Sequence, residues 1–226
     1  MSPDPPPPSF YDRLPDAAVK DLHSIATARR FRRGEVLFRE GDDGGTVFVL
    51  LAGQVKLSVS ALSGKDVILA VRDPREILGE IAAIDGGPRS ATGAALNDVD
   101  TLAIRHAAFV DFLARHPAAA VALLETIAAK LREASSRQLE FGTSDALSRV
   151  CTILLELADR YGSDGPNGRI VELPVSQQEL ASLAGLSREA VVKGLAALCS
   201  LDMIRTNGRS VVLLDEMALR RRSEAG

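Results

Sequence analysis

The most regular pattern of apolar and polar positions lies in residues 174–198, PVSQQELASLAGLSREAVVKGLAAL. Apolar residues recur at helical spacing on both sides of Gly185, which predicts two short helices joined by a tight turn, because glycine adopts the φ > 0 conformation that such a turn needs. Ser176 and Ser187 stand where helix N-caps are expected. We expect the first helix over residues 177–183. The buried stripe of the second helix is Ala190, Val191, Leu195 and Leu198.

Three charged residues remain on the outward side of the second helix: Arg188, Glu189 and Lys193. Arginine can bond guanine O6 and N7, glutamate can accept from cytosine N4, and lysine can reach guanine or a phosphate. A solvated helix face is the ordinary interpretation of three such charges taken alone. Combined with the caps and the glycine turn, they predict a helix-turn-helix motif that binds DNA.

A β-hairpin is predicted directly after this motif. Residues 201–206 are a short apolar segment, Asn207-Gly208 is a hairpin turn signal, and residues 210–214 have the pattern of a strand. A hairpin in this place indicates a winged helix-turn-helix. The candidate DNA-binding residues are Ser176, Gln178, Ser187, Arg188, Glu189, Lys193 and Arg209.

The first half of the chain has a different pattern, with short apolar segments between glycine-containing turns over residues 30–104. Strands are expected at 47–51, 55–59 and 67–71, and their spacing indicates a β-sandwich or jelly roll. A helix is expected at about 107–113, and Pro117 begins a long one that reaches about Phe141. The proline tract at residues 3–8 predicts an extended or disordered arm.

The long helix carries a candidate seam for a coiled coil. Its positions, at alternating spacings of three and four, are Leu124, Ile127, Leu131, Ala134, Gln138 and Phe141. A seam of this kind can also pack on its own domain. We favour a parallel homodimer for two reasons. The helix connects the predicted sensor to the DNA-binding motif, and a motif that reads a short site needs two half-sites.

The order of a β-roll, a long helix and a C-terminal winged motif resembles the CRP/FNR-type regulators, from about Phe10 onward. The most specific blocks are Leu78-Gly79-Glu80-Ile81, residues 87–92 (GPRSAT) and residues 186–191 (LSREAV). The resemblance implies an α+β fold with a cyclic-nucleotide-binding jelly roll, a long dimerisation helix and a winged helix-turn-helix. We accordingly expect a flexible arm at 1–15, a sensor domain at 16–116, the dimerisation helix at 117–145 and the DNA-binding domain at 146–226.

The resemblance also implies a phosphate-binding cassette, with Gly79, Glu80, Ile81, Ala82, Arg89 and Ser90 as ligand-binding residues. Arg89 would meet the cyclic phosphate, and Glu80 would accept a hydrogen bond from the ribose 2′-hydroxyl. Gly79 would let the backbone approach the sugar. The alternative is that Glu80 and Arg89 form an ion pair across a turn.

Cyclic AMP is the expected effector, because both Glu80 and Arg89 are present. In the cyclic AMP receptors of this family a Thr-Ser pair on the long helix reads the adenine, and a gapless match places Ala134 and Ser135 there. Ser135 and Ser136 are the candidate base-reading residues if the match shifts by one position. Cyclic GMP, another nucleotide, or no ligand at all are the alternatives.

The mechanism implied by the resemblance is allosteric control of DNA binding. The expected partner is a palindromic duplex with TGTGA-like half-sites, because Arg188, Glu189 and Lys193 match the base-contacting positions of the family, with RNA polymerase as a further candidate partner. A cyclic-nucleotide-binding module whose winged domain contacts protein is the alternative of a different class.

The composition of the chain bears on the DNA-binding surface, on the state of the cysteines and on whether a metal site or enzyme activity is expected. The 226 residues carry a net charge of −3, so DNA binding requires a local basic surface, for which the candidates are Arg188, Lys193, Arg205, Arg209 and the run Arg220-Arg221-Arg222. The two cysteines, Cys151 and Cys199, lie in apolar helical patterns and are expected to be buried thiols. The three histidines show no metal-site spacing, and no nucleophile motif has a supporting context. We therefore expect no enzyme activity, no metal or cofactor, and a cytoplasmic protein without a membrane span.

Overall fold

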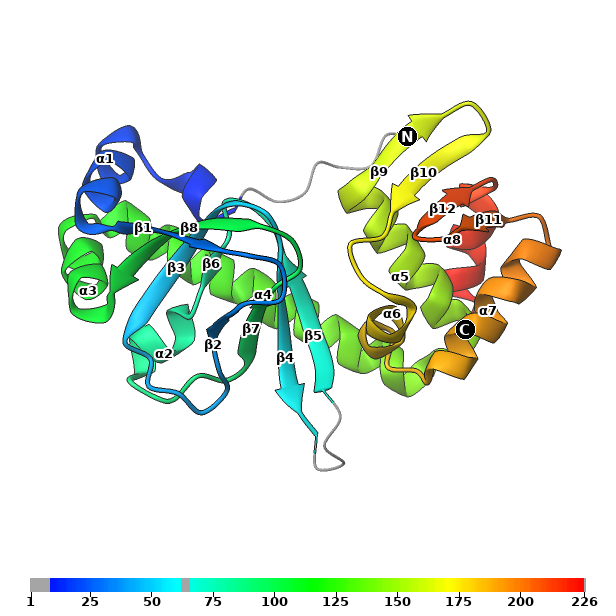
Figure 1. Ribbon diagram of the computed structural model, residues 1–226, viewed down its shortest axis with the longest axis horizontal. Helices are drawn as coiled ribbons and strands as arrows, with labels where there is room; N and C mark the ends of the chain where they lie inside the picture. The colour runs from blue at the N-terminus through cyan, green and yellow to red at the C-terminus, as the bar shows by residue number, and fades with distance from the viewer. Residues whose placement is uncertain (1–8, 62–65, 226) are drawn as a thin grey trace. The chain divides into compact units, whose positions relative to one another are not determined.

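The structure is a computed structural model that describes residues 9–61 and 66–225, except for the side chain of Phe141. The chain forms two compact units, and the boundary between them falls between Arg132 and Glu133. Figure 1 shows a β-roll in the first unit and a mostly helical second unit with its own small sheet. The predicted proline arm at residues 3–8 lies outside the described residues.

The first unit contains two antiparallel sheets of four strands each. One has the order β1 (Thr27–Phe31), β8 (Val99–Arg105), β3 (Thr46–Ala52), β6 (Ile77–Leu78). The other has the order β2 (Val36–Phe38), β7 (Thr92–Ala95), β4 (Val55–Ser60), β5 (Asp66–Arg72). This arrangement confirms the predicted jelly-roll class, and the three predicted strands correspond to β3, β4 and β5.

Strand β3 shows why the unit needs helices as well as a second sheet. Phe48 and Leu50 lie in a core cluster with residues of both sheets, including Val55 of β4. Val47 and Val49 point the other way and lie in a second cluster with the helices. Because successive side chains of a strand alternate in direction, β3 is buried on both faces and reads as a continuous apolar run.

Four helices complete the first unit together with the short helix η1 (Tyr11–Arg13). They are α1 (Asp16–Ile25), α2 (Glu80–Asp85), α3 (His106–Arg115) and the first part of α4 (Pro117–Thr143). Phe109 and Phe112 of α3 are fully buried in the helical cluster. Phe10 is buried there too, with its ring 6.3 Å from that of Phe109.

The burial of Phe10 corrects the predicted extent of the flexible arm. Residues 1–15 were expected to be an arm because of the proline tract, yet Phe10 and Leu14 belong to the core of the first unit. Their apolar side chains gain more from burial than an extended proline segment would. The predicted separate dimerisation helix differs as well, since α4 is shared by both units.

After the end of α4, the second unit continues with α5 (Ala146–Tyr161), and its sheet has the order β11 (Ile204–Asn207), β12 (Ser210–Leu213), β10 (Gly168–Glu172), β9 (Gly162–Gly165). Helices α6 (Gln177–Leu183) and α7 (Arg188–Ser200) form the helix-turn-helix. The predicted hairpin is confirmed as β11 and β12. The sequence reading missed β9 and β10, because the glycine-rich segment around Gly165 lacks an alternating pattern.

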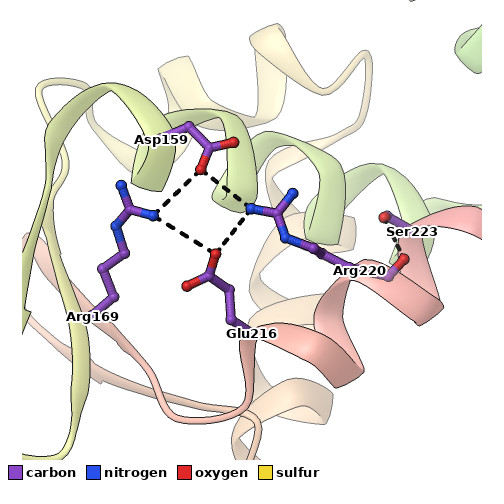
Figure 2. Close-up of polar contacts among 5 residues, drawn as sticks. All are labelled: Asp159, Arg169, Glu216, Arg220 and Ser223. Atoms are coloured by element: carbon purple, nitrogen blue, oxygen red, sulfur yellow. Dashed lines mark hydrogen bonds and ion pairs between the residues drawn. The ribbon is translucent and has the colours of Figure 1, made fainter. Parts of the chain in front are cut away.

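Helix α8 (Glu216–Glu224) closes the second unit by packing along α5, with Leu219 fully buried. Figure 2 shows four charged side chains at one end of this contact. Arg220 bonds Asp159 of α5 at 3.3 Å and Glu216 at 2.9 Å, and Arg169 of β10 meets the same two carboxylates at 3.4 and 3.7 Å. Strand, helix and C-terminal helix are therefore fixed to one another by alternating charges.

In the part of the chain that the structure describes, no single helix is long and apolar enough to cross a bilayer. Helices α3 and α4 have the length and composition of a membrane span only when they are taken together, and a sharp bend separates them.

Candidate functional site

A pocket in the first unit opens beside α2. It encloses about 360 Å³ of space, a figure that includes open solvent at its mouth. Its lining consists of Phe38, Leu57, Leu78, Gly79, Glu80, Ile81, Ala82, Arg89, Ser90 and Ala91. The structure thus brings the six predicted cassette residues together around one cavity. Leu78 and Ala91 belong to the same sequence blocks, whereas Phe38 and Leu57 are wall residues that the sequence analysis missed.

Arg89 is a buried cation at this pocket, with a relative exposure of 4%. Its guanidinium donates from Nη1 to the carbonyl oxygen of Gly79 at 3.0 Å and from Nη2 to that of Thr46, and it lies 4.7 Å from the centre of the Phe38 ring. Burial lowers the pKa of Arg89, against the pull of the nearby carboxylates of Glu80 and Asp42. Among the described residues no carboxylate bonds it, and Nε has no hydrogen-bond partner. The site is therefore suited to an anion.

Gly79 makes this position of Arg89 sterically feasible. Its φ is +77°, and a Cβ there would collide with the Arg89 guanidinium and lie 3.2 Å from Thr46 O. The helix α2 starts directly afterwards with Glu80. The absence of a side chain, together with the left-handed backbone, places the cation and the helix start at one wall of the pocket.

Glu80 is also buried, and its Oε1 accepts from Lys130 Nζ at 2.8 Å. The same ammonium donates to Ile77 O at 2.8 Å. The alternative of an ion pair between Glu80 and Arg89 is wrong for the described residues, because the partner of Glu80 is Lys130 on α4. A buried carboxylate needs such a counter-charge, and the helix supplies it.

Lys130 is a site residue that the sequence reading missed. A signal for it existed in the register of α4. Leu123 is buried in the helical core cluster and Ile127 packs against that cluster, so Lys130 continues the same inward stripe at positions i, i+4 and i+7.

The predicted seam of α4 is divided between two environments. Leu124 and Leu131 are 66% and 67% exposed. Ile127, which was predicted to belong to the same seam, instead packs against the core of the first unit. Ala134 and Gln138 are exposed, and the side chain of Phe141 lies outside the described residues. The exposed positions are free for a coiled coil and Ile127 is not, so the seam as an interface stays a prediction.

The two candidate base-reading residues do not belong to the pocket wall. Ser135 and Ser136 are exposed residues of α4 beyond the boundary of the first unit. Neither lines the pocket. A role in reading the base stays a prediction.

The helix-turn-helix of the second unit has the predicted caps. Ser176 and Glu179 form a reciprocal capping box on α6, in which Ser176 N donates to the Glu179 carboxylate at 2.8 Å. Ser187 Oγ accepts from Ala190 N at 3.1 Å at the start of α7. Between the helices, Gly185 has φ +62°. These local contacts fix where the recognition helix begins.

The three charged residues of α7 are exposed as predicted, and Val192 is exposed beside them. Arg188, Glu189 and Lys193 are exposed, as are Gln178 on α6 and Arg209 in the turn between β11 and β12. Exposure is what base contacts by the start of α7 and a phosphate contact by the hairpin turn require, and these contacts stay predictions.

The predicted basic surface is smaller than the sequence indicated. Arg220 is engaged by Asp159 and Glu216, and Arg222 Nη2 bonds Asp145 at 2.6 Å. These two arginines neutralise carboxylates within the unit and hold α8 in place. The sequence predicts both arginines as part of the DNA-binding surface, because it does not show which carboxylates fold against them.

Comparisons with known proteins agree with this geometry. Residues 28–116 match the family model of the cyclic nucleotide-binding domain, and residues 148–222 match the Crp-like helix-turn-helix domain. A CRP-like cAMP-activated global transcriptional regulator of Mycobacterium tuberculosis is 31% identical over 214 residues, covering 95% of this chain and 96% of the relative.

Two proteins of Thermus thermophilus are also similar. Its cyclic AMP receptor protein is 32% identical over 216 residues, which cover 93% of this chain and 96% of the relative. The solved structure of TTHB099, a CRP-family transcriptional regulator, is 26% identical, covers 87% of this chain and 96% of its own, and superposes with a TM-score of 0.74. All three relatives carry the names of transcription regulators or receptors. The chain belongs to the CRP/FNR family of DNA-binding transcription regulators with a cyclic nucleotide-binding domain.

Proposed function

We propose that this protein is a homodimer that binds a palindromic DNA site under the control of a cyclic nucleotide, with cyclic AMP as the effector. The observation that carries the proposal is Arg89, a buried guanidinium at the pocket that donates to two carbonyl oxygens and lies over one aromatic ring. A cyclic phosphodiester carries one negative charge. It would supply the anion that this cation lacks, and Ser90 at the wall could add a donor.

The contact between Glu80 and Lys130 supports a route from the pocket to α4. A ribose 2′-hydroxyl that donates to Glu80 either competes with the Lys130 ammonium for the carboxylate or reinforces the hydrogen bond of 2.8 Å between Lys130 Nζ and Glu80 Oε1. Either change acts on α4, the helix that continues to Thr143. Occupation of the pocket thereby changes the packing of this helix, which is the differential contact that an allosteric ligand needs.

The exposed leucines of α4 support the dimer. Leu124 and Leu131 lie seven residues apart, and Val121, which is 54% exposed, extends the same face. Apolar side chains at heptad spacing form the seam between two helices in a coiled coil. Two copies joined there would present two recognition helices to a palindromic site, whose half-sites are expected to resemble TGTGA.

The names of two relatives support cyclic AMP as the effector, since one is called cAMP-activated and the other a cyclic AMP receptor. Arg89 and Glu80 provide the chemistry for phosphate and ribose, which all cyclic nucleotides share. Discrimination of the base is assigned to Ser135 and Ser136. A panel of cyclic nucleotides therefore decides the identity of the effector.

Calorimetry with cyclic AMP and cyclic GMP, followed by fluorescence anisotropy on palindromic and random duplexes, tests the proposal. We expect cyclic AMP to bind and to raise the affinity for the palindrome. Arg89→Leu should abolish the response to nucleotide, and Arg188→Ala should abolish the preference for the palindrome.

Two matched variants serve as controls. Arg30→Leu removes an exposed arginine whose partners are Asp98 and Asp100, and should leave nucleotide binding intact. Arg221→Ala removes an exposed charge of α8 and should leave sequence preference intact. Identical DNA binding with and without every cyclic nucleotide would refute the ligand part of the proposal. Absence of binding to either duplex at low salt would favour a module that contacts protein.

A further inference from the structure

The C-terminal helix α8 is bonded to both ends of α5. Glu216 and Arg220 meet Asp159 near the end of α5 in the network of Figure 2. Six residues further along α8 than Glu216, Arg222 reaches Asp145, the N-cap of α5. The two helices therefore run in opposite directions along each other, with Leu219 buried between the two polar ends.

The contact at the start of α5 is a closed set of hydrogen bonds. Asp145 Oδ1 accepts from Ser148 N at 2.8 Å, which is the cap itself, and Oδ2 accepts from Arg222 Nη2 at 2.6 Å. Arg222 Nη1 donates to Ser148 Oγ at 2.5 Å, and that hydroxyl donates to Arg222 O at 3.0 Å. Ser148 is fully buried. One forked guanidinium thus binds the cap residue and the side chain of the first turn together.

The same first turn of α5 touches the helix-turn-helix. Arg149 Nη1 donates to Gly185 O, in the turn between α6 and α7, at 3.3 Å. At the next residue of α5, a Cβ added to Gly194 of α7 would lie 3.1 Å from Val150 Cγ2, so α7 passes close to α5 at this point. A continuous chain of contacts leads from Arg222 through the first turn of α5 to the turn and body of the recognition helix.

The position of this turn in the chain gives the contact its significance. Helix α4, which carries Lys130 and its bond to Glu80, ends at Thr143, and Asp145 caps α5 two residues later. Any change that α4 transmits along the chain reaches α5 at this cap, and Arg137 of α4 also bonds Glu156 of α5 at 3.3 Å. A first turn that frays would absorb the change, whereas a first turn held by a side chain from α8 would pass it on as a rigid body.

We propose that Arg222 is a positioning residue for DNA binding: by locking Asp145 and Ser148, it fixes the first turn of α5 against the helix-turn-helix and so couples α4 to the recognition helix. The inference rests on the proposed function for the identity of the signal. Arg222 acts through α5, and its contacts within the unit leave the charge for Asp145 and not for a phosphate.

The test is Arg222→Gln in the full-length protein. The readouts are calorimetry with cyclic AMP and duplex affinity with and without saturating cyclic AMP. Allosteric ligands change affinity by about 5- to 150-fold. We expect Arg222→Gln to keep the affinity for cyclic AMP within about twofold, and to reduce the nucleotide-induced rise in duplex affinity to about twofold or less. A rise equal to that of the wild type would overturn the proposal.

Three companions separate positioning from a loss of fold or of charge. Arg221→Gln removes the neighbouring exposed arginine of the same helix, a candidate of the basic surface, and should keep the full nucleotide-induced rise in duplex affinity; an equal loss of that rise would mean that basic charge on α8 acts directly on DNA. Arg222→Lys should restore part of the response, because an ammonium can reach Asp145 but cannot fork onto Ser148 as well. Asp145→Asn retains a capping side chain, and combined with Arg222→Gln it should add nothing further.

Thermal unfolding of each variant verifies that the second unit is folded at the assay temperature. If the wild type binds the palindrome equally with and without every cyclic nucleotide, the proposed function fails but the role of Arg222 is still measurable. In that case Arg222→Gln should lower duplex affinity relative to Arg221→Gln, and equal affinities would overturn the positioning role.

Discussion

Gly79 meets two requirements of the pocket, a left-handed backbone conformation and space for the Arg89 guanidinium. It combines a φ of +77° with a Cβ position that the Arg89 guanidinium occupies. Gly86, at the other end of α2, has a φ of +69° but open space around its Cβ position. Substitutions at Gly79 and Gly86 can therefore be compared to separate the effect of backbone strain from the effect of displacing Arg89.

We expect both Gly79→Ala and Gly86→Ala to lower the free energy of unfolding by about 1 kcal/mol or more, since alanine is strained at positive φ. Only Gly79→Ala should also weaken cyclic AMP binding, because its methyl group pushes Arg89 from its place. Urea unfolding and calorimetry measure the two effects. An equal loss of nucleotide affinity in both variants would contradict this account of Arg89.

The two cysteines differ in their surroundings. Cys151 is buried in α5, and burial raises the pKa of its thiol to about 11, whereas Cys199 is only half-buried. Because the thiolate is the reactive form, iodoacetamide at about pH 8 should modify Cys199 well before Cys151. Peptide mass spectrometry of native and urea-unfolded protein gives the comparison. Rapid modification of Cys151 in the native protein would show that α5 opens readily.

At the scale of elements, the cap of α5 has a pH dependence of definite sign. The hydrogen bond from Arg222, followed by that from Ser148 N, lowers the pKa of Asp145 from 3.8 to about 2. The stabilisation is therefore complete above about pH 4 and is lost as the pH falls through about 2. Since the Asp145 side chain is 54% exposed, solvent screening keeps the contribution small.

Asp145→Asn isolates this contribution, because asparagine still caps the helix but does not titrate. The difference in free energy of unfolding between wild type and variant should be constant from about pH 7 to about pH 4 and shrink below that. Urea unfolding at a series of pH values measures it. A difference that grows on acidification would mean that another group governs the cap.

At the scale of the whole molecule, the proposed homodimer is tested at the exposed leucines of α4. Leu131→Glu places a charge on the proposed seam and should yield monomers in sedimentation experiments. Loss of the second recognition helix should weaken binding to the palindrome by about 10²-fold or more. Val110→Glu, at a 44% exposed apolar residue of α3, is the matched control and should remain a dimer. A Leu131→Glu dimer would remove α4 as the interface.

What the sequence by itself determined is mainly local. The caps Ser176 and Ser187, the turn at Gly185 and the bounds of α6 follow from interactions between residues three or four apart, and the structure has them as predicted. The strands β3, β4 and β5 follow from runs of apolar residues between turns. The six cassette residues could be named because a family motif keeps them adjacent in the chain.

Tertiary structure decided which charges meet. Lys130 reaches Glu80 across 50 positions of sequence, and Arg222 reaches Asp145 across 77. Several arginines could have paired with these carboxylates by charge alone. From the sequence, an ion pair with Arg89 is only the alternative for Glu80, and Arg222 is a candidate for the DNA-binding surface. A partner is selected by where burial of the apolar stripes on α4, α5 and α8 places each helix, because a buried charge must pair with whatever lies within reach. The motif at residues 174–198 can therefore be predicted from the sequence, whereas the contacts proposed to control it are decided by the tertiary structure.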